Sequence, residues 1–380
     1  MSSLPNRARS LRAKIIFLVS EDWYFVSHRL DLARSAVDMG FDVVVATRPG
    51  RHRDLIEAAG IRLVPMEISR GIESPLAEIS GILRIWRLYR HERPDIVHHV
   101  ALKPILLGGV AARLAGISRV VAAVAGLGFL FSAGGRAPVL ARLLRRLMPI
   151  LVGRGRAIVQ NPDDAAVLTA WGVPDGQVRL IRGAGVDTQR YTPRPEAGGI
   201  PLVLLPARLL WDKGVGEFIE AARRIRAAGL PARFVLAGAP DLANPASVSE
   251  ATVKAWVEEG VVEWWGHRDD MPETLGASAI VCLPSYREGL PKSLLEAAAC
   301  GRPIVTTDVP GCREVVLDGD NGYLVPARDV PSLVLALTRL IGDPEQRRLM
   351  GERGRLRAET EFSQQRVCAE TLAVYRELLS

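Results

Sequence analysis

The most informative part of the chain is residues 280–304, which read IVCLPSYREGLPKSLLEAAACGRPI. The first four residues are apolar and predict a buried strand, and a turn containing glycine and proline follows. Pro291 then stands at the start of a predicted helix over 292–299, where the missing N–H of proline costs nothing. This order of strand, turn and helix places free backbone amides at the carboxyl edge of a parallel sheet, a geometry that binds phosphate.

Two glutamates belong to this segment, Glu288 in the turn and Glu296 in the helix. Eight helical steps would leave them about 80° out of line, so they do not share a helix face. We expect them to reach different parts of one extended ligand. The alternatives are purely structural: Glu288 would be favourably placed near a helix N-terminus, and Glu296 would be an ordinary helix carboxylate.

The rest of the chain repeats this order of short apolar strand and amphipathic helix. Alternation at this spacing predicts parallel strands joined by crossover helices. The stretch 192–199, TPRPEAGG, separates two such series and is the best linker. We expect strands over 14–20, 42–46, 62–65, 96–99, 120–125 and 157–160, then over 202–206, 234–237, 280–283 and 304–306, with helices over 27–39, 76–90, 215–228, 292–299 and 330–341.

The expected architecture is an α/β protein with two doubly wound parallel-sheet domains. The first spans 1–191 and the second 192–362, and 363–380 forms a C-terminal helix that can cross back to the first domain or pack on the second. A length of 380 residues and a hydrophobic content of 48% agree with two folded domains. The apolar run 120–131 is shorter than the roughly 20 residues of a membrane-spanning helix. The run 15–19 is short and has no cleavage site, so we expect no signal peptide.

Several classes of function lose support because their motifs are missing from the sequence. The four cysteines match no metal-ligand spacing and are too sparse for a secreted disulfide scaffold, which favours reduced cytosolic thiols. Gly126-Leu-Gly128 lacks the third glycine of a dinucleotide fingerprint, and no phosphate-loop motif occurs. The aspartate pairs 163–164 and 269–270 are adjacent, which is not a metal-type spacing.

Charge divides the chain into two unlike halves. Residues 1–190 hold 27 Lys and Arg against 16 Asp and Glu, whereas residues 191–380 hold 22 against 26. This asymmetry predicts that the first half meets an anionic surface or ligand. Nucleic acid is disfavoured because the basic region has no interleaved aromatics and matches no common binding module. Between Asp95 and Asp163 there is no acid, and the bases are Lys103, Arg113, Arg119, Arg136, Arg142, Arg145, Arg146, Arg154 and Arg156.

The segment 138–152, PVLARLLRRLMPILV, is a basic amphipathic helix without acids. Arg142, Arg145 and Arg146 share one face, with leucines and isoleucines elsewhere. This pattern is typical of a helix on an anionic membrane surface. The alternative is that the apolar residues pack beneath the first domain, since Pro149 shortens or kinks the helix.

Other motifs accompany the glutamates: GAGVD at 183–187, ARLLWDKG at 207–214, PGCRE at 310–314 and DGDNG at 318–322. Together with the E-x7-E segment, the chain resembles retaining glycosyltransferases of the GT-B fold, specifically glycosyltransferase family four. The resemblance implies two Rossmann-like domains that face a central cleft. It also implies a donor site in which Arg208 and Lys213 grip the diphosphate, Glu296 holds the ribose hydroxyls, Glu288 faces the transferred sugar, and Ser285, Gly289 and Leu290 belong to the same binding segment.

The first half more loosely resembles a branch that acts on polyprenyl-diphosphate-linked saccharides in bacterial envelope glycan assembly. Many family members carry a histidine after the fifth strand, where this chain has Gly126 and Leu127. We expect His98 or His99 to substitute, although each is equally a plain loop histidine. Lys103 either meets the acceptor pyrophosphate or is a helix-start lysine. The expected acceptor-binding residues are His28, His98, His99, Lys103, Gly126 and Gly128.

The residues and this resemblance together predict a glycosyltransferase that needs no metal or other cofactor, and the resemblance implies that it retains the anomeric configuration. It would move a hexose or N-acetylhexosamine from a nucleotide sugar, with UDP as the expected nucleotide, to a lipid-diphosphate-linked saccharide. The resemblance implies that it works at the cytoplasmic face of the plasma membrane. The alternatives are a sugar-nucleotide 2-epimerase, a glycogen- or sucrose-type enzyme with a soluble acceptor, and a non-catalytic membrane-docked scaffold.

Overall fold

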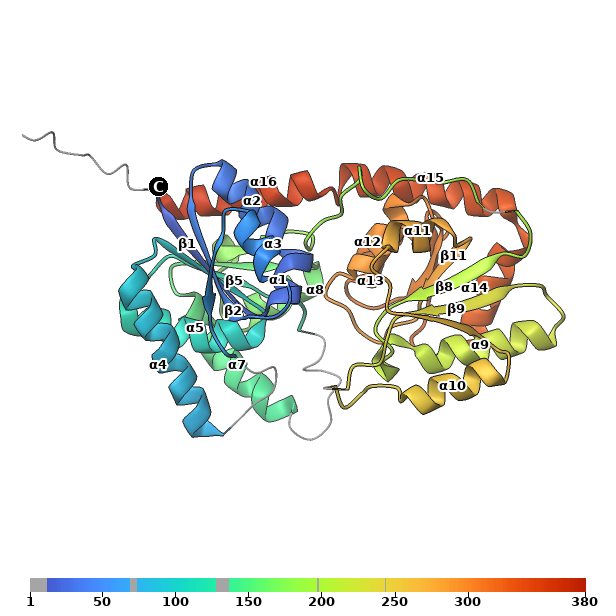
Figure 1. The fold of residues 1–380 in the computed structure, drawn as a ribbon, viewed down its shortest axis with the longest axis horizontal. Helices are drawn as coiled ribbons and strands as arrows, with labels where there is room; N and C mark the ends of the chain where they lie inside the picture. Colours follow the sequence, from blue (N-terminus) through green and yellow to red (C-terminus); the bar gives the residue numbers. More distant parts are fainter. Residues whose placement is uncertain (1–11, 69–73, 128–136, 197, 243) are drawn as a thin grey trace, which may run out of the picture.

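The computed structural model of the chain describes residues 12–68, 74–127, 137–196, 198–242 and 244–380. Figure 1 shows two α/β lobes side by side, each with a central parallel sheet covered by helices. Within the described ranges, the sheet of the first lobe has seven strands in the order β3-β2-β1-β4-β5-β6-β7. Their bounds are β1 Lys14–Glu21, β2 Asp42–Arg48, β3 Arg62–Pro65, β4 Ile96–Val100, β5 Val120–Ala123, β6 Arg156–Val159 and β7 Val178–Leu180.

The second lobe repeats this architecture. As far as the described residues extend, its sheet has six strands in the order β10-β9-β8-β11-β12-β13, with parallel pairing of neighbours. Both sheets reverse their strand order beside the first strand, at β1/β4 and at β8/β11, which is where doubly wound folds bind ligands. The bounds are β8 Leu202–Pro206, β9 Arg233–Ala237, β10 Glu263–Gly266, β11 Ile280–Leu283, β12 Ile304–Thr307 and β13 Gly322–Val325.

Helices lie on both faces of each sheet (Figure 1). In the first lobe they are α1 Asp22–His28, α2 Leu30–Asp38, α3 Arg53–Ala58, α4 Pro75–Glu92, α5 Leu102–Ala115, α7 Ala137–Val152 and α8 Pro162–Ala170. In the second they are α9 Val215–Ala227, α10 Glu250–Glu258, α11 Met271–Gly276, α12 Lys292–Ala299, α13 Cys312–Val315, α14 Val330–Gly342 and α15 Pro344–Thr360. The last helix is α16 Gln364–Leu379.

Burial on both sheet faces explains why the central strands are almost uninterrupted apolar runs. In β1 successive side chains point to opposite faces. Ile16 packs in a cluster with Tyr89 of α4, whereas Phe17 packs on the other face in a cluster with Tyr375 of α16. The carboxyl ends of β1, β4, β8 and β11 are thereby fixed where the two lobes meet.

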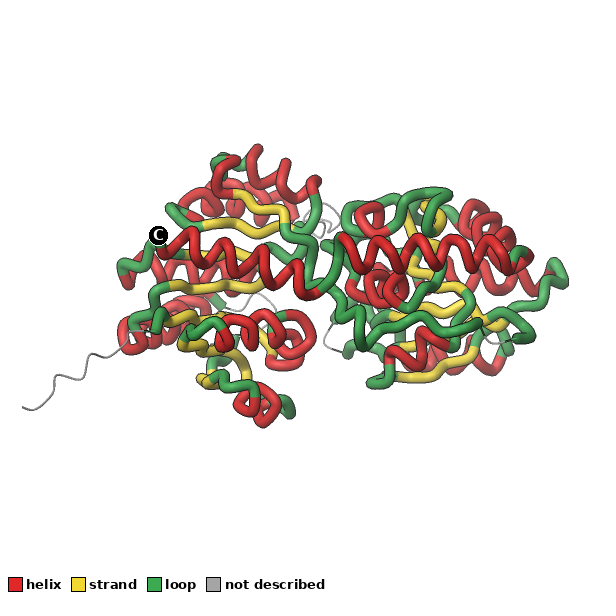
Figure 2. Tube along the Cα trace, turned by 90° about the horizontal axis from the view of Figure 1, so that it is seen from above, coloured by secondary structure: helices red, strands yellow, loops and turns green. Residues whose placement is uncertain are grey.

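The C-terminal helix α16 packs against the first lobe. Figure 1 shows α15 and α16 following one another along the top of both lobes, and Figure 2 views the molecule from that side. Tyr375 of α16 is fully buried, and its hydroxyl lies 2.6 Å from Nδ1 of His98. Glu377 pairs with Arg156 and Arg179, each at 2.7 Å. The last helix therefore belongs to the core of the first lobe.

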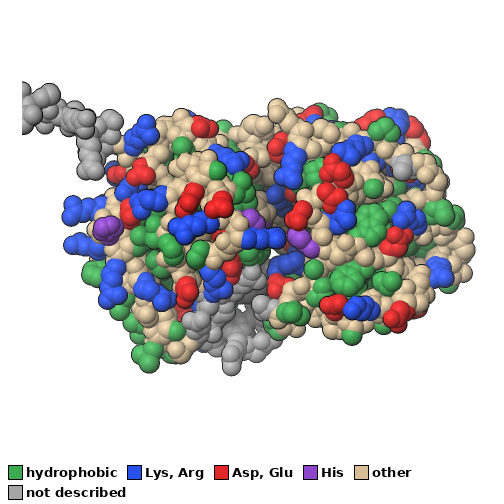
Figure 3. Space-filling view, viewed as in Figure 1, with side chains coloured by type: hydrophobic (Ala, Val, Ile, Leu, Met, Phe, Trp, Pro, Cys, Tyr) green, Lys and Arg blue, Asp and Glu red, His purple; other side chains and the backbone are tan. Residues whose placement is uncertain are grey.

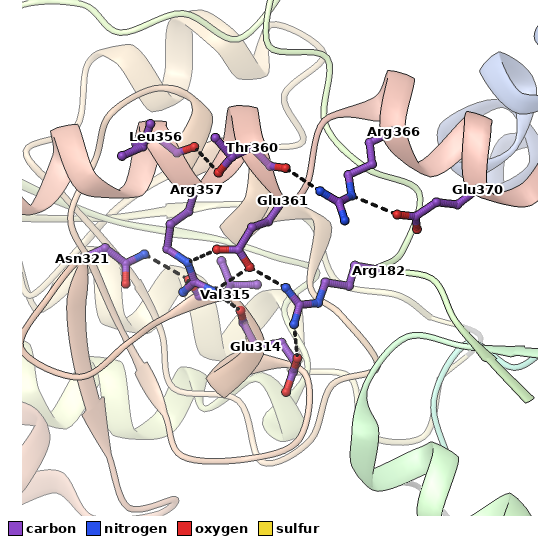
Figure 4. A network of polar contacts seen from close by, with 10 residues as sticks. All are labelled: Arg182, Glu314, Val315, Asn321, Leu356, Arg357, Thr360, Glu361, Arg366 and Glu370. Carbon is purple, nitrogen blue, oxygen red and sulfur yellow. Dashed lines mark hydrogen bonds and ion pairs between the residues drawn. The ribbon is translucent and has the colours of Figure 1, made fainter. Parts of the chain in front are cut away.

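The chain crosses between the lobes twice, and the two crossings lie side by side. The N–H of Val186 donates to the carbonyl of Phe362, and the N–H of Gln364 donates to the carbonyl of Val186, both at 2.9 Å. Figure 4 shows the side chains around this crossing. Arg182 pairs with Glu361 and, at 3.5 Å, with Glu314 of α13. Both backbones and charged side chains thus join the lobes here.

Two sequence-based expectations need correction. The single helix expected over 27–39 is two helices, because Arg29 adopts φ −134° and ψ −10° between α1 and α2. Strands β7, β10 and β13 were not expected; they are three or four residues long and carry half-buried positions, so their apolar signal is weak. In the part of the chain that the structure describes, every helix is too short or too polar to span a bilayer.

Candidate active site

A cleft lies between the carboxyl edges of the two sheets. It holds a cavity of about 580 Å³, lined from the first lobe by residues after β1, β4, β5 and β6 and from the second by residues after β8 and β11. Basic side chains gather at the centre of the molecule between the lobes in Figure 3. The polar side chains that line it include Ser20, Glu21, Tyr24, His28, Lys103, Gln160, Arg208, Lys213, Glu288, Lys292 and Ser293.

The segment between β11 and α12 forms one wall of this cavity. Glu288, Gly289 and Leu290 line it, and Pro291 precedes α12 as its N-cap. The first amides of α12 have no intrahelical acceptors and carry the positive end of the helix dipole. The side-chain amide of Asn161, in the first lobe, donates to the carbonyl of Gly289 at 2.8 Å and holds this turn in place. The wall is therefore suited to an anion.

Two cations reach the cavity from the loop after β8. Lys213 Nζ lies 2.5 Å from Glu288 Oε1, and Arg208 forms a 2.6 Å ion pair with Asp241. Each cation is thus paired with a carboxylate. A diphosphate would offer both cations a stronger anionic partner. On its binding, the ion pairs with the carboxylates would be replaced by ion pairs with the phosphates.

Glu296 lies behind the cavity and does not line it. Its side chain is 9% exposed and accepts a 2.9 Å hydrogen bond from the hydroxyl of Tyr191. Burial, and to a smaller extent the negative charge of Glu296, raises the pKa of Tyr191. The phenol therefore stays protonated and donates a hydrogen bond to Glu296. Lys292 Nζ is 3.5 Å from the same carboxylate. Glu288 therefore lies in the turn and Glu296 in the helix, as the sequence predicted, and their contact with different parts of one ligand stays a prediction.

Among the described residues, His28 is the only histidine that lines the cleft. Its ring stacks on Tyr24, with centroids 4.1 Å apart and planes 6° from parallel. Burial, assisted by the charges of Lys292 and Arg29, lowers the pKa of His28 to about 3, so the ring is neutral at pH 7. Lys103 also lines the cavity and pairs with Glu78 at 2.9 Å.

The two histidines of β4 are not in the cleft, which corrects our expectation. His98 and His99 are 1% and 0% exposed. His98 bonds to Tyr375 at 2.6 Å, and His99 Nε2 lies 2.9 Å from the hydroxyl of Tyr89. Both belong to the core of the first lobe because they are on a central strand that is buried on both faces.

Three further expected site residues have other positions. Ser285 is fully buried, and its hydroxyl donates to the carbonyls of Asp212 and Arg287, so it supports the turn and does not line the cavity. Gly126 lies opposite Gly289, within van der Waals reach. Gly128 lies outside the described residues.

The face of α7 that carries Arg142, Arg145 and Arg146 is exposed. Leu143 and Ile150 are 50% and 49% exposed beside it. On the opposite side, apolar residues pack into the first lobe: Leu144, Met148, Leu151 and Val152. The apolar side therefore packs in the first lobe, as the alternative interpretation predicted, and contact of the exposed basic face with a membrane stays a prediction.

Sequence reasoning missed Asp241, Tyr24 and Lys292. The loop of Asp241 follows β9, next to β8, so its place at the sheet edge could have been found only by assigning the strand order. Lys292 stands four residues before Glu296 and shares its helix face, a signal present in the sequence. Among the described residues, no cluster of three or more His, Cys, Asp or Glu is placed to hold a metal ion.

Two Rossmann-like domains around a cleft of this kind define the GT-B class of glycosyltransferases. Comparison with family models agrees: residues 14–153 match "Glycosyl transferase 4-like" and residues 200–343 match "Glycosyl transferases group 1". These two matches cover most of the chain. The chain belongs to the GT-B glycosyltransferases of family-four type, and it is a glycosyltransferase.

Named relatives and solved structures support this assignment. The chain is 27% identical over 334 residues to a Campylobacter jejuni N,N'-diacetylbacillosaminyl-diphospho-undecaprenol α-1,3-N-acetylgalactosaminyltransferase, covering 84% of this chain and 87% of that protein. It is 28% identical to an Escherichia coli UDP-Gal:α-D-GlcNAc-diphosphoundecaprenol α-1,3-galactosyltransferase, covering 71% and 72%. The 2-epimerase alternative finds no support in these relatives.

Among solved structures, the sucrose-phosphate synthase of Thermosynechococcus elongatus superposes with a TM-score of 0.81 at 19% identity, covering 97% of this chain and 99% of that one. HepE of Anabaena, in complex with UDP and glucose, gives a TM-score of 0.76 at 19% identity, covering 95% and 100%. These likenesses establish the GT-B fold.

Proposed function

We propose that this enzyme transfers a hexose or N-acetylhexosamine from a UDP-sugar, with retention of the anomeric configuration, to a saccharide carried on a polyprenyl diphosphate. One observation carries the proposal: Arg208, Lys213 and the N-terminal amides of α12 meet at one cavity beside Glu288. The names of the relatives from C. jejuni and E. coli supply the acceptor class, and the name of the E. coli relative supplies UDP.

The chemistry requires that the C1–oxygen bond to the donor diphosphate breaks while a new C1–oxygen bond to the acceptor forms. Arg208, Lys213 and the helix amides would stabilise the negative charge that develops on the departing diphosphate. The acceptor hydroxyl attacks from the side that the diphosphate leaves, and its proton passes to a phosphate oxygen. This route needs no separate protein base. We propose that these protein groups suffice without a metal ion, so a chelator should leave the rate unchanged.

The first experiment identifies the nucleotide. Thermal denaturation is followed with uridine, guanosine and adenosine diphosphates, because a ligand that binds only the folded protein raises its apparent stability. Uridine diphosphate should give the largest shift. Transfer is then measured from UDP-hexoses and UDP-N-acetylhexosamines to lipid-diphosphate-linked and to soluble saccharides. Release of UDP only with the lipid-linked acceptor supports the proposal, and equal transfer to a soluble glucan would contradict it.

We further propose that the exposed basic face of α7 docks on an anionic membrane surface. Each of Arg142, Arg145 and Arg146 would add about 1 kcal/mol near an anionic leaflet, and the exposed Leu143 and Ile150 could enter the interface. The test is sedimentation with vesicles of anionic lipid, comparing the wild type with the variant in which the three arginines become Glu. A matched control reverses three exposed arginines of α9, α15 and α16: Arg224, Arg353 and Arg366. Loss of sedimentation in both variants, or in neither, would refute the assignment to α7.

A further inference from the structure

Lys292, the first residue of α12, joins the donor domain to the acceptor domain. Its ammonium donates a 2.8 Å hydrogen bond to the carbonyl of Ser27 in α1 and lies 3.5 Å from the carboxylate of Glu296. Neither contact is needed to build α12, since one partner is in another domain and the other is a side chain one turn further on. The lysine therefore links a donor-site carboxylate to the backbone of the opposite lobe.

The partner of Lys292 on the first lobe is electrostatically suited to a cation. Ser27 is in the last turn of α1, which ends at His28. The final carbonyls of a helix have no intrahelical donors and carry the negative end of the helix dipole. Lys292 thus supplies from the second lobe a favourable charge for the C-terminus of α1. Separation of the lobes would remove this contact.

Lys292 also stands at the boundary between two cavities. It lines the cleft and, together with His28, a second cavity of about 200 Å³ beside Tyr191 and α16. Glu296 is held by Tyr191 from the segment that crosses between the lobes and by Lys292 from its own helix. A lysine has three N–H donors, so it can serve Glu296 and Ser27 together. The charge next to Glu296 therefore depends on the position of the first lobe.

We propose that Lys292 is a positioning residue that couples the carboxylate of Glu296 to closure of the acceptor domain over the cleft. The inference rests on the proposed function, in which Glu296 belongs to the nucleotide-sugar site. Loss of the ammonium should weaken the closed arrangement and slow transfer, while the nucleotide contacts of Arg208 and Lys213 persist.

The kinetic test compares Lys292→Met, which keeps the length of the side chain without the charge, with Lys292→Arg, which keeps the charge. In Lys292→Met, kcat should fall about 10-fold, the size expected for one hydrogen bond to a charged group, whereas the Kd for uridine diphosphate should change less than about 3-fold. Lys292→Arg should recover most of kcat. The control is Lys254→Met, at an exposed lysine of α10. The proposal would be overturned if kcat fell equally in Lys292→Met and Lys292→Arg. It would also be overturned if the affinity of Lys292→Met for uridine diphosphate fell as much as its kcat.

A double-mutant cycle tests whether Lys292 acts through Glu296. In the Glu296→Gln background, adding Lys292→Met should reduce kcat by less than about 2-fold, because coupled residues do not act additively. Full additivity would show that Lys292 acts elsewhere.

A structural readout keeps this inference separate from the proposed function. Spin labels are placed at Leu55→Cys on α3 and Leu335→Cys on α14, both exposed positions. The four native cysteines are buried, and burial raises the pKa of their thiols, so the introduced thiols react first. In Lys292→Met the inter-label distance distribution should shift to longer values relative to the wild type. An unchanged distribution refutes the coupling even if transfer is observed, and a shift supports it even if the chosen donors fail.

Discussion

Gly126 and Gly289 face each other across the cleft with no room for a side chain between them. A Cβ on Gly126 would lie 3.0 Å from the Cα of Gly289, and a Cβ on Gly289 would lie 2.3 Å from the carbonyl oxygen of Ala125. The two lobes therefore touch backbone to backbone at the point where related enzymes, by the resemblance noted above, carry a histidine. In this chain that position is a contact between domains.

Substitution Gly126→Ala should therefore hinder closure. Gly126 has φ +121°, a region that residues with a Cβ rarely adopt, so the variant combines backbone strain with a steric clash. We expect kcat to fall on the order of 10-fold if about 1–2 kcal/mol of strain falls on the closed form. The matched control is Gly176→Ala, where a Cβ meets nothing within 4 Å. Normal turnover in Gly126→Ala would contradict the need for this close approach.

Removal of either cation should slow transfer strongly. Arg208→Ala or Lys213→Ala should each reduce kcat on the order of 100-fold, because each removes a charge that stabilises the leaving diphosphate. Steady-state rates at saturating donor and acceptor are the measurement, with thermal denaturation as a check on folding. Arg224→Ala, at an exposed arginine of α9, is the control. Near-normal turnover in both cleft variants would remove the proposed mechanism.

Asp241→Asn should tighten the binding of nucleoside diphosphate. The carboxylate of Asp241 occupies Arg208 at 2.6 Å, so an incoming phosphate must compete with it and is repelled by it. Neutralising one partly exposed carboxylate should improve affinity about 3- to 10-fold in calorimetric titration. Asp320→Asn, which removes an exposed carboxylate paired with Arg353, should leave affinity unchanged. Weaker binding in Asp241→Asn would mean that the aspartate orients Arg208 for the ligand.

The buried histidines should make folding sensitive to mild acid. Burial lowers the pKa of His99 to about 3, whereas in the unfolded chain it is near 6.5. Between these values the unfolded chain takes up a proton that the folded chain refuses, so stability is complete above pH 6.5 and falls as pH decreases. The loss is about 1.4 kcal/mol per pH unit for each such group.

Urea unfolding at pH 7.5 and 5.5 measures this effect, since the carboxylates titrate mainly below that window. In His99→Gln the difference in unfolding free energy between the two pH values should shrink by about 1.4 kcal/mol. His267→Asn, at a 64% exposed side chain, should not alter it. An unchanged pH difference in His99→Gln would show that the pKa of His99 is the same in the folded and the unfolded chain.

Much of this architecture was predictable because it depends on local patterns. The strand of residues 280–283 and the helix of 292–299 were predicted with their observed bounds, since an apolar run, a turn and a proline at the helix start mark them. The position of Asp241 beside Arg208 and the burial of His98 and His99 were not predictable. They depend on which strands are central in the sheet, and no residue pattern within those segments states that.

The paired crossing at Val186 and Ser363 has a mechanical consequence. Two backbones pass between the lobes side by side, joined by hydrogen bonds in both directions. This paired connection favours a hinge rotation of one lobe relative to the other about the crossing. It opposes sliding or twisting of the lobes. The cavity lies between the two lobes that this connection joins, so a rotation about the crossing would widen or narrow the gap that admits the two sugars.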